Sequence, residues 1–212
     1  MTDQKKHVLP SSLKGLTDEI SRRMPDKTRF EHTISVAYEC LSIAEYFTHI
    51  DKVELCKAAL LHDIAKGLSS KEFEELDRKY SIGFTVHDLE APAVMHAKAG
   101  AMIASREFST SVEVAKAIAE HTTGAPDMSL ISKILFIADY VEVTRKWESC
   151  KQARRELYLA LEKEDSDPML ILDLTIVSII DKTAAHIEST GRKVHPDSLL
   201  CKEFILKNRK SY

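Results

Sequence analysis

The stretch Ala58-Ala59-Leu60-Leu61-His62-Asp63-Ile64-Ala65-Lys66-Gly67 has the composition of the last turns of an apolar helix that a glycine closes. At helical spacing His62 falls on one apolar stripe and Asp63 on the next, so both side chains are expected to face the core. A carboxylate in an apolar environment is costly unless it is paired or bound to a metal. Taken alone, the pair would be explained by a helix-ending aspartate beside a core histidine with satisfied hydrogen bonds.

The composition is that of an ordinary globular protein. The chain has 212 residues, 44% hydrophobic and 30% charged, and its net charge of −3 gives no broad footprint for nucleic acid. The four cysteines form no C-x-x-C pair, so we expect reduced core thiols and a cytoplasmic location. Met1–Pro10 lacks the apolar segment of a signal peptide, and the apolar run Met169–Ile180 is too short to span a membrane. We expect neither a nucleic-acid nor a membrane partner.

Helical periodicity dominates the chain, and glycine and proline are scarce at six each, so an all-α fold is expected. Asp51–Glu54 and Ser69–Glu72 have the form of capping boxes, and Asp167-Pro168 is a cap followed by proline. Ser81–Pro92 is interpreted as a loop. One expected helix begins at 51, carries His62 and Asp63, and has Gly67 as its C′ residue. A last helix ends at 208. The other expected helices cover 12–24, 27–47, 69–80, 96–106, 110–124, 128–145, 151–163 and 168–191.

Inward-facing histidines and aspartates recur on five of the expected helices. Any one of the histidines alone would be explained as a satisfied core residue. Together they would place several unpaired polar groups in one core, at about 1 to 3 kcal/mol each and more for charges, and a shared metal site removes that cost. Imidazole mixed with carboxylate suits Fe, Mn, Co or Zn, and the lack of thiolates argues against a closed structural zinc site. The set consists of His32, His62, Asp63, His96, His121 and Asp139.

Sequence motifs of other catalytic and metal-binding architectures are missing. The chain has no Glu-x-x-His pair of the ferritin-like di-iron kind and no H-E-x-x-H. It also lacks G-x-x-x-x-G-K-[ST], G-x-G-x-x-G and G-x-S-x-G. The metal hypothesis therefore depends on the histidines and aspartates named above.

Five short motifs hold these residues in a fixed order along the chain. They are Arg29-x-x-His32, His62-Asp63-x-Ala65-Lys66, His96-Ala97-x-x-Gly100-Ala101, His121-Thr122-x-Gly124 and Ala138-Asp139-Tyr140-x-Glu142. This order resembles the HD-domain metal phosphohydrolases, and within them the YqeK subfamily of symmetrical diadenosine tetraphosphate hydrolases. The resemblance covers 29–145 and extends to the turn at His195. It departs at Val143, where the family commonly has proline, and in a longer N-terminal extension.

The resemblance implies a role for each matching residue. His32, His62, Asp63 and Asp139 would hold a first metal, often iron. His96 and His121 would hold a second metal that Asp63 bridges, or would contact phosphate when one metal is present. The residues implied in catalysis are Asp63, Lys66, His96 and His121. Those implied in binding nucleotide and phosphate are Arg29, Asp63, Ile64, Ala65, Lys66, His96, His121, Asp139, Tyr140, Arg145, Val194, His195, Pro196, Asp197, Ser198 and Leu199.

The resemblance also implies an HD-domain helical bundle with the metal site in its core. We expect one domain over residues 1–212, with an extension helix in 1–25, the motif-bearing core in 26–145 and helices in 146–212 that complete the bundle and the nucleotide site. A homodimer is expected from the resemblance and from the apolar stretch Met169–Ile180, which would serve either an interface or the core.

The implied reaction is the metal-dependent cleavage of diadenosine tetraphosphate into two ADP. A metal acidifies water to a pKa of about 7, and two metals about 3.5 to 4 Å apart can hold it in line with phosphorus. Arg29, Lys66 and Arg145 would offset the charge of the leaving group, although Lys66 and Arg145 would also be explained as solvated groups at helix ends. The alternatives are an HD phosphohydrolase acting on a nucleoside triphosphate, a nucleoside monophosphate or a guanosine alarmone, or a non-catalytic metal-bound nucleotide sensor.

Overall fold

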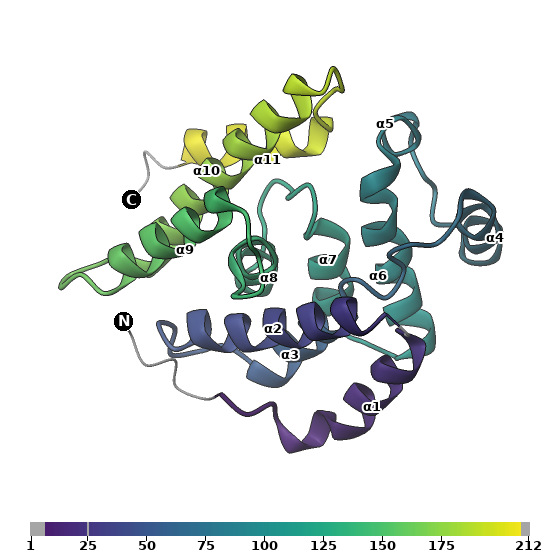
Figure 1. The fold of residues 1–212 in the computed structure, drawn as a ribbon, viewed down its shortest axis with the longest axis horizontal. Helices are drawn as coiled ribbons and strands as arrows, with labels where there is room; N and C mark the ends of the chain where they lie inside the picture. The colour runs from purple at the N-terminus through teal and green to yellow at the C-terminus, as the bar shows by residue number, and fades with distance from the viewer. Residues whose placement is uncertain (1–6, 25, 209–212) are drawn as a thin grey trace.

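The structure, a computed structural model, describes residues 7–24 and 26–208 (Figure 1). Within these ranges it is helical and contains no strand, which confirms the expected all-α fold. Met1–Lys6 and Pro25, parts of the expected N-terminal extension, lie outside the described residues. The elements are η1 (Ser11–Leu13), α1 (Lys14–Arg23), α2 (Lys27–Ala44), α3 (Lys52–Leu61), α4 (Ser70–Tyr80), α5 (Val86–Glu90), η2 (Pro92–Val94), α6 (Met95–Glu107), α7 (Val112–Glu120), α8 (Leu130–Val141), α9 (Glu148–Leu161), α10 (Pro168–Ser189) and α11 (Pro196–Asn208).

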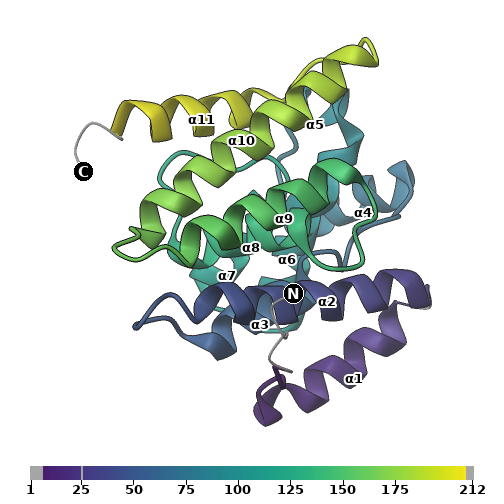
Figure 2. The ribbon, with the colours of Figure 1, turned by 60° about the vertical axis from the view of Figure 1, so that its left-hand side comes forward.

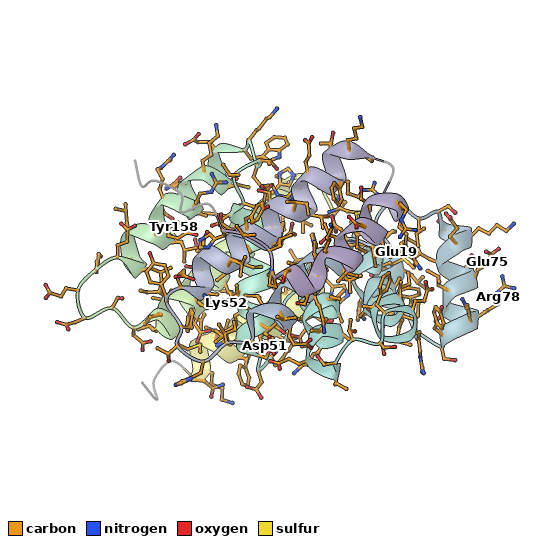
Figure 3. All side chains as sticks on the ribbon, turned by 90° about the horizontal axis from the view of Figure 1, so that it is seen from below. Glu19, Asp51, Lys52, Glu75, Arg78 and Tyr158 are labelled. Carbon is orange, nitrogen blue, oxygen red and sulfur yellow. The ribbon has the colours of Figure 1, made fainter. Side chains whose placement is uncertain are left out.

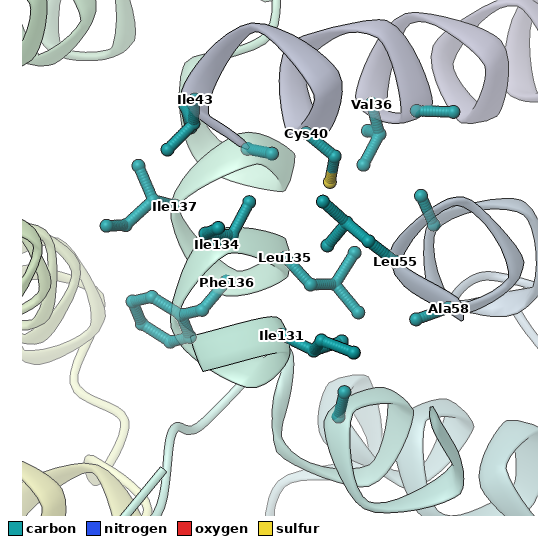
Figure 4. Close-up of a cluster of buried hydrophobic side chains, with 14 of the residues drawn as sticks. Val36, Cys40, Ile43, Leu55, Ala58, Ile131, Ile134, Leu135, Phe136 and Ile137 are labelled. Atoms are coloured by element: carbon teal, nitrogen blue, oxygen red, sulfur yellow. The ribbon is translucent and has the colours of Figure 1, made fainter. Parts of the chain in front are cut away.

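The centre of the core lies between α2, α3 and α8 (Figure 4). Cys40 of α2, Leu55 of α3 and Leu135 of α8 are fully buried there. α8 is surrounded by other elements and packs on α2, α3, α7, α9 and α10. This position explains why apolar residues occur all round α8 rather than along one stripe. Its buried apolar residues are Ile131, Ile134, Leu135, Phe136, Ile137, Ala138 and Val141.

The remaining helices cover this centre from several sides. α7 packs on both α6 and α8, and α10 packs on α8, α9 and α11 (Figure 2). A smaller apolar cluster, which includes Ala65, Phe73 and Ile103, joins α4 to α6 and to the turn after α3. The interior between α2, α3, α6, α7 and α8 is therefore enclosed, and a polar group placed there has little access to water.

Aspartate caps begin three of the helices. Asp26, Asp51 and Asp167 each accept two backbone N–H groups, at the starts of α2, α3 and α10. Figure 3 labels Asp51 and Lys52 at the start of α3. The capping box expected at Asp51 is wrong in one respect, because the Glu54 carboxylate accepts bonds from Lys57 and Ser111 instead of from the Asp51 backbone. The capping box expected at Ser69–Glu72 is present.

The helix that leads to His62 is shorter than expected. α3 ends at Leu61 with His62 as its C-cap, so Gly67 is not the C′ residue. Tight turns come next, in which the N–H groups of Ile64 and Lys66 donate to the carbonyls of Leu61 and Asp63, each three residues earlier. The Arg29 guanidinium donates to the carbonyl of Lys66 and holds this turn. A distant side chain therefore braces the chain shortly after it leaves α3.

Several other boundaries differ from expectation, since α2 ends at Ala44 instead of at 47 and α7 ends at Glu120 instead of at 124. Ser81–Pro92 is not a loop throughout, because Thr85 and Asp88 form a capping box that begins the short helix α5. The helix expected from Met128 to Arg145 begins at Leu130 with Ser129 as its cap and ends at Val141. Glu142 has an extended backbone with ψ of 155°, so the chain leaves the helix there.

None of the helices within the described ranges combines the length and the apolar character that crossing a membrane requires. The four cysteines are free and buried, as expected.

Gly124 provides a test of how the C-terminal helix packs. Its φ is +68°, and a Cβ there would lie 2.8 Å from Sγ of Cys201 in α11. We expect Gly124→Ala to lower the free energy of unfolding by about 2 to 4 kcal/mol, from left-handed backbone strain and from overpacking. Urea denaturation measures the loss.

Gly191→Ala is the matched control for this variant. Gly191 also has a positive φ, of +73°, but a Cβ there would meet nothing within 4 Å. Only the backbone strain of about 1 to 2 kcal/mol is expected. Equal losses in the two variants would show that the contact between Gly124 and Cys201 contributes nothing.

Candidate metal centre

Six ionisable side chains from five parts of the fold meet in the interior. They are His32 in α2, His62 and Asp63 directly after α3, His96 in α6, His121 directly after α7 and Asp139 in α8. Four of the six are buried, and the side chains of His32 and Asp139 are 13% and 16% exposed. The residues that the sequence marked as costly in a core thus lie in one cluster.

Three of the four histidines are oriented in the same local way. Nδ1–H of His62, His96 and His121 donates to the backbone carbonyl three residues earlier, at 2.7, 2.8 and 2.7 Å. All three lie at helix boundaries, where backbone carbonyls have spare hydrogen-bonding capacity. The bond selects the tautomer with a bare Nε2 and directs that atom to the centre of the cluster.

His32 lies inside α2 and uses a different acceptor. Its Nδ1–H donates to Oε1 of the fully buried Glu142 at 3.0 Å. Its Nε2 lies 3.0 Å from Oδ1 of Asp139 and 3.9 Å from Oδ2 of Asp63. All four imidazoles therefore present Nε2 to Asp63, and His32 and His62 also face Asp139.

The other contacts at the centre are equally short. Nε2 of His62 lies 3.5 Å from Oδ2 of Asp63 and 3.8 Å from Oδ1 of Asp139. Nε2 of His96 lies 3.2 Å from Oδ1 of Asp63 and 3.2 Å from Nε2 of His121. Because Nδ1 carries the hydrogen in these histidines, the facing Nε2 and Oδ atoms present lone pairs to one another.

This arrangement of lone pairs fits a cation. The buried Oδ1 of Asp63 and Nε2 of His62 have no hydrogen-bond partner, and such atoms are costly in a dry interior. A positive ion between them would turn repulsion into coordination, and a donor set of imidazole and carboxylate suits a transition metal. Three overlapping groups bring their ligand atoms within 4.8 Å of one another: His32, His62 and Asp63; His62, His121 and Asp139; and Asp63, His96 and His121.

The surrounding charges keep both aspartates ionised. Burial alone would raise the pKa of Asp63, but His62, His121, His96 and Lys66 outweigh it and hold that pKa well below its usual range. Burial is likewise outweighed at Asp139, whose pKa is held well below its usual range by His32, Arg145 and His62. An ionised carboxylate is the form that binds a metal.

The histidines differ in their affinity for protons. Burial lowers the pKa of His62 to about 4 and also lowers the pKa of His96, so both are neutral and ready to act as ligands at pH 7. Burial also disfavours the charged form of His32, but its bonds to Asp139 and Glu142 prevail and raise its pKa to about 9. A metal at this end of the cluster would therefore replace a proton on His32.

Three cationic side chains stand beside the cluster. Lys66 Nζ donates to Oδ2 of Asp63 at 2.8 Å, and Arg145 donates to Oδ1 of Asp139 at 2.5 Å. Arg29 braces the turn through the carbonyl of Lys66, and its guanidinium lies against Gly67. A guanidinium has five N–H donors, so these contacts leave others available. The cations expected to bind phosphate thus lie next to the expected metal ligands.

The remaining residues expected to bind nucleotide are less closely connected to the cluster. Ile64 and Tyr140 are half-buried beside Asp63 and Asp139, whereas Ala65 is fully buried in the smaller apolar cluster. His195 lies 3.5 Å from Asp88 of α5. Within the described residues, no hydrogen bond or ion pair joins Val194–Leu199 to the six clustered side chains.

Glu142 and Asp88 are two buried carboxylates that the sequence did not mark as site residues. Glu142 bonds to His32, and Asp88 accepts a bond from Lys98 at 2.7 Å and faces His195. Thr85–Asp88 has the form of a capping box and could have revealed α5. Nothing in the local sequence marks the bond between Glu142 and His32, because 110 positions separate them.

Comparisons with known proteins agree with this geometry. A family model described as the HD domain matches residues 29–144. The symmetrical bis(5'-nucleosyl)-tetraphosphatase of Halalkalibacterium halodurans is 31% identical over 175 residues, which are 81% of this chain and 85% of that protein. The protein of the same name from Bacillus subtilis is 28% identical over 174 residues, which are 81% and 86% of the two chains.

A solved structure shares the fold. It is described as a predicted HD superfamily hydrolase involved in NAD metabolism from Clostridium acetobutylicum, and it matches with a TM-score of 0.79 at 24% identity over 92% of this chain and 96% of that chain. The matched family model spans every one of the six clustered residues and more than half of the sequence. The chain therefore belongs to the HD domain family.

Proposed function

We propose that this protein hydrolyses dinucleoside polyphosphates and cleaves diadenosine tetraphosphate symmetrically into two ADP. The observation that carries the proposal is the convergence of four imidazole Nε2 atoms on the carboxylates of Asp63 and Asp139, with cations beside them. The names of the relatives from Halalkalibacterium halodurans and Bacillus subtilis support the choice of substrate. The complete ligand set favours an enzyme over a non-catalytic sensor, which would be expected to lack a ligand.

The residues of the cluster would hold the metal in two overlapping sets. His32, His62, Asp63 and Asp139 would bind the first ion, and Asp63 would bridge to a second ion at His96 and His121. The chemistry supplied at such a centre is Lewis-acid activation of water and of phosphoryl oxygens at neutral pH. We propose iron as the native metal, with manganese, cobalt or zinc as substitutes that the same ligands accept.

The chain's own cations would bind and orient the polyphosphate. The Lys66 ammonium has three N–H donors and donates one hydrogen bond to Asp63, so it can also donate to a phosphate oxygen while it remains next to that carboxylate. Arg145 can do the same beside Asp139 at the other side of the cluster, and Arg29 supports the turn that carries Lys66. When the central P–O bond breaks, these cations would offset the charge of the departing ADP.

The nucleoside ends of the substrate would lie further out. We propose that Ile64, Ala65, Tyr140 and the turn Val194–Leu199 line the nucleotide site, with the Ala65 contribution made by its backbone because its side chain is buried. We also propose a cytoplasmic location, which the four free cysteines support.

The products of the reaction test the symmetrical mechanism. With diadenosine tetraphosphate as substrate, we expect ADP alone, because water must attack a phosphorus atom next to the middle of the chain. Anion-exchange chromatography of a time course measures the products. AMP together with ATP would reject symmetrical cleavage, and faster turnover of nucleoside triphosphates would favour a different HD phosphohydrolase.

Asp63 is expected to be the ligand that activity can least spare. It faces all four histidines, so Asp63→Asn removes a negative charge from both metal sets while it keeps the size of the side chain. We expect kcat/KM and metal content to fall together by more than about 100-fold, beyond the usual cost of losing a partner outside the ligand shell. Turnover assays and elemental analysis of the same preparations measure both.

His121→Ala is the comparison for that variant. His121 belongs to the second set and would contact only the second metal or a phosphate, so a smaller loss of about 10- to 100-fold is expected, with the first metal retained. A dead His121→Ala protein beside an active Asp63→Asn protein would show that the two roles are reversed.

We propose a homodimer. The apolar face of α10, which includes Ile171 and Leu174, is half-exposed in the single chain. Light scattering of the purified protein should give twice the mass of 23.9 kDa. The monomer mass across a concentration series would refute the dimer.

A further inference from the structure

We propose that Glu142 is a positioning residue that fixes the metal ligand His32, and that Arg154 of α9 holds Glu142 in place. The inference rests on the proposed metal centre and extends it to a helix that begins after residue 144, where the matched family segment ends. α9 lies along α8 with α10 on one side of it, and α2 runs on the opposite side in the view of Figure 2.

His32 needs a partner that the other three histidines do not need. It is the sixth residue of α2, so the carbonyls one turn before it are engaged in the helix. His62, His96 and His121 each have a backbone carbonyl for Nδ1–H. Among the four clustered histidines, His32 alone donates to a carboxylate.

Hydrogen bonds to both oxygens hold the carboxylate of Glu142 in place. It is fully buried, and besides the bond from His32 it accepts the backbone N–H of Thr144 at Oε2 and the Thr144 hydroxyl at Oε1, both at 2.6 Å. These donors lower its pKa to about 2 in spite of burial. A buried charge with this many donors has one orientation, and it transfers that orientation to the imidazole.

Arg154 fixes the backbone from which this side chain extends. Its guanidinium donates to the carbonyls of Val141 and Glu142, where α8 ends. The last carbonyls of a helix lack partners within the helix, so an arginine from a neighbouring helix can satisfy them. The order of contacts is therefore Arg154, the end of α8, Glu142, His32 and the metal.

The contacts from Arg154 through Glu142 should affect the metal set that contains His32 and leave the set of Asp63, His96 and His121 unchanged. A carboxylate behind an imidazole raises its basicity and holds its ring plane, and loss of such a partner costs about 10- to 100-fold in metal affinity. Only the set that contains His32 has this partner. The set of Asp63, His96 and His121 is oriented by backbone carbonyls and should not respond.

The test compares two adjacent arginines of α9 by titration with Co²⁺ alone, in competition with a chromophoric chelator. Arg154→Met should weaken Co²⁺ binding at the set that contains His32 about 10-fold, and Glu142→Gln should weaken it by about 10- to 100-fold. Arg155→Met is the matched control, because Arg155 is exposed and bonds only to Glu148 among the described contacts; we expect its Co²⁺ affinity to equal that of the wild type.

A second control separates this path from the general packing of α9. The Tyr158 hydroxyl donates to Glu39 of α2 at 2.7 Å, so Tyr158→Phe loosens α9 without touching Glu142 (Figure 3 labels Tyr158). We expect it to lower the melting temperature but not the affinity for Co²⁺. Equal losses of affinity in Tyr158→Phe and Arg154→Met would overturn the proposal.

Wild-type affinity in Glu142→Gln would also overturn the proposal. If Glu142→Gln fails to fold, Thr144→Val serves in its place. Thr144 is exposed, and its hydroxyl donates a hydrogen bond to the Glu142 carboxylate. Weaker Co²⁺ binding in Thr144→Val supports the proposal, and unchanged binding contradicts it. The readout needs no substrate, so a wild type that leaves diadenosine tetraphosphate uncleaved would refute the proposed function and not this inference.

Discussion

The negative charge of Asp63 is the constraint on which the interior depends. Its side chain is 1% exposed, and an ionised carboxylate in such a place is stable only when cations or donors surround it. The Lys66 ammonium is one such donor, and the four imidazoles face the same carboxylate from α2, α6 and the turns after α3 and α7. The close packing of these elements therefore depends on how the charge of Asp63 is balanced, and a bound cation would balance it.

Helix ends are the device that places the ligands. His62 and His121 occupy the C-caps of α3 and α7, where a free carbonyl can orient the imidazole without breaking the helix. α6 passes beside this end of α3, where a Cβ at Gly100 would be in ordinary contact, 3.4 Å from the carbonyl of His62. The bond from Nδ1–H to the backbone restricts the rotamer of each imidazole, and a metal site needs side chains that are held in a fixed geometry.

Features that depend on the cost of burial could be predicted from the sequence, whereas features that depend on distant pairing could not. Histidines and aspartates on apolar stripes are costly unless they meet, so the six clustered residues were predictable. The end of α3 at Leu61 was not, because Arg29 holds the turn from 37 positions away. The role of Glu142 was hidden for the same reason, and α5 was missed because its Thr85–Asp88 capping box lies in a stretch of irregular pattern.

The C-terminal helices are more than a cover over the matched family segment. Residues 29–144 contain all six clustered residues, yet the carbonyls of Val141 and Glu142 at the end of that segment are satisfied by Arg154, which lies beyond it. The same helix reaches α2 through Tyr158 and Glu39. The ligand-bearing helices α2 and α8 are thus both tied to α9. A segment cut after residue 144 would keep every ligand and lose the contacts that hold His32 and Asp139 at a fixed separation.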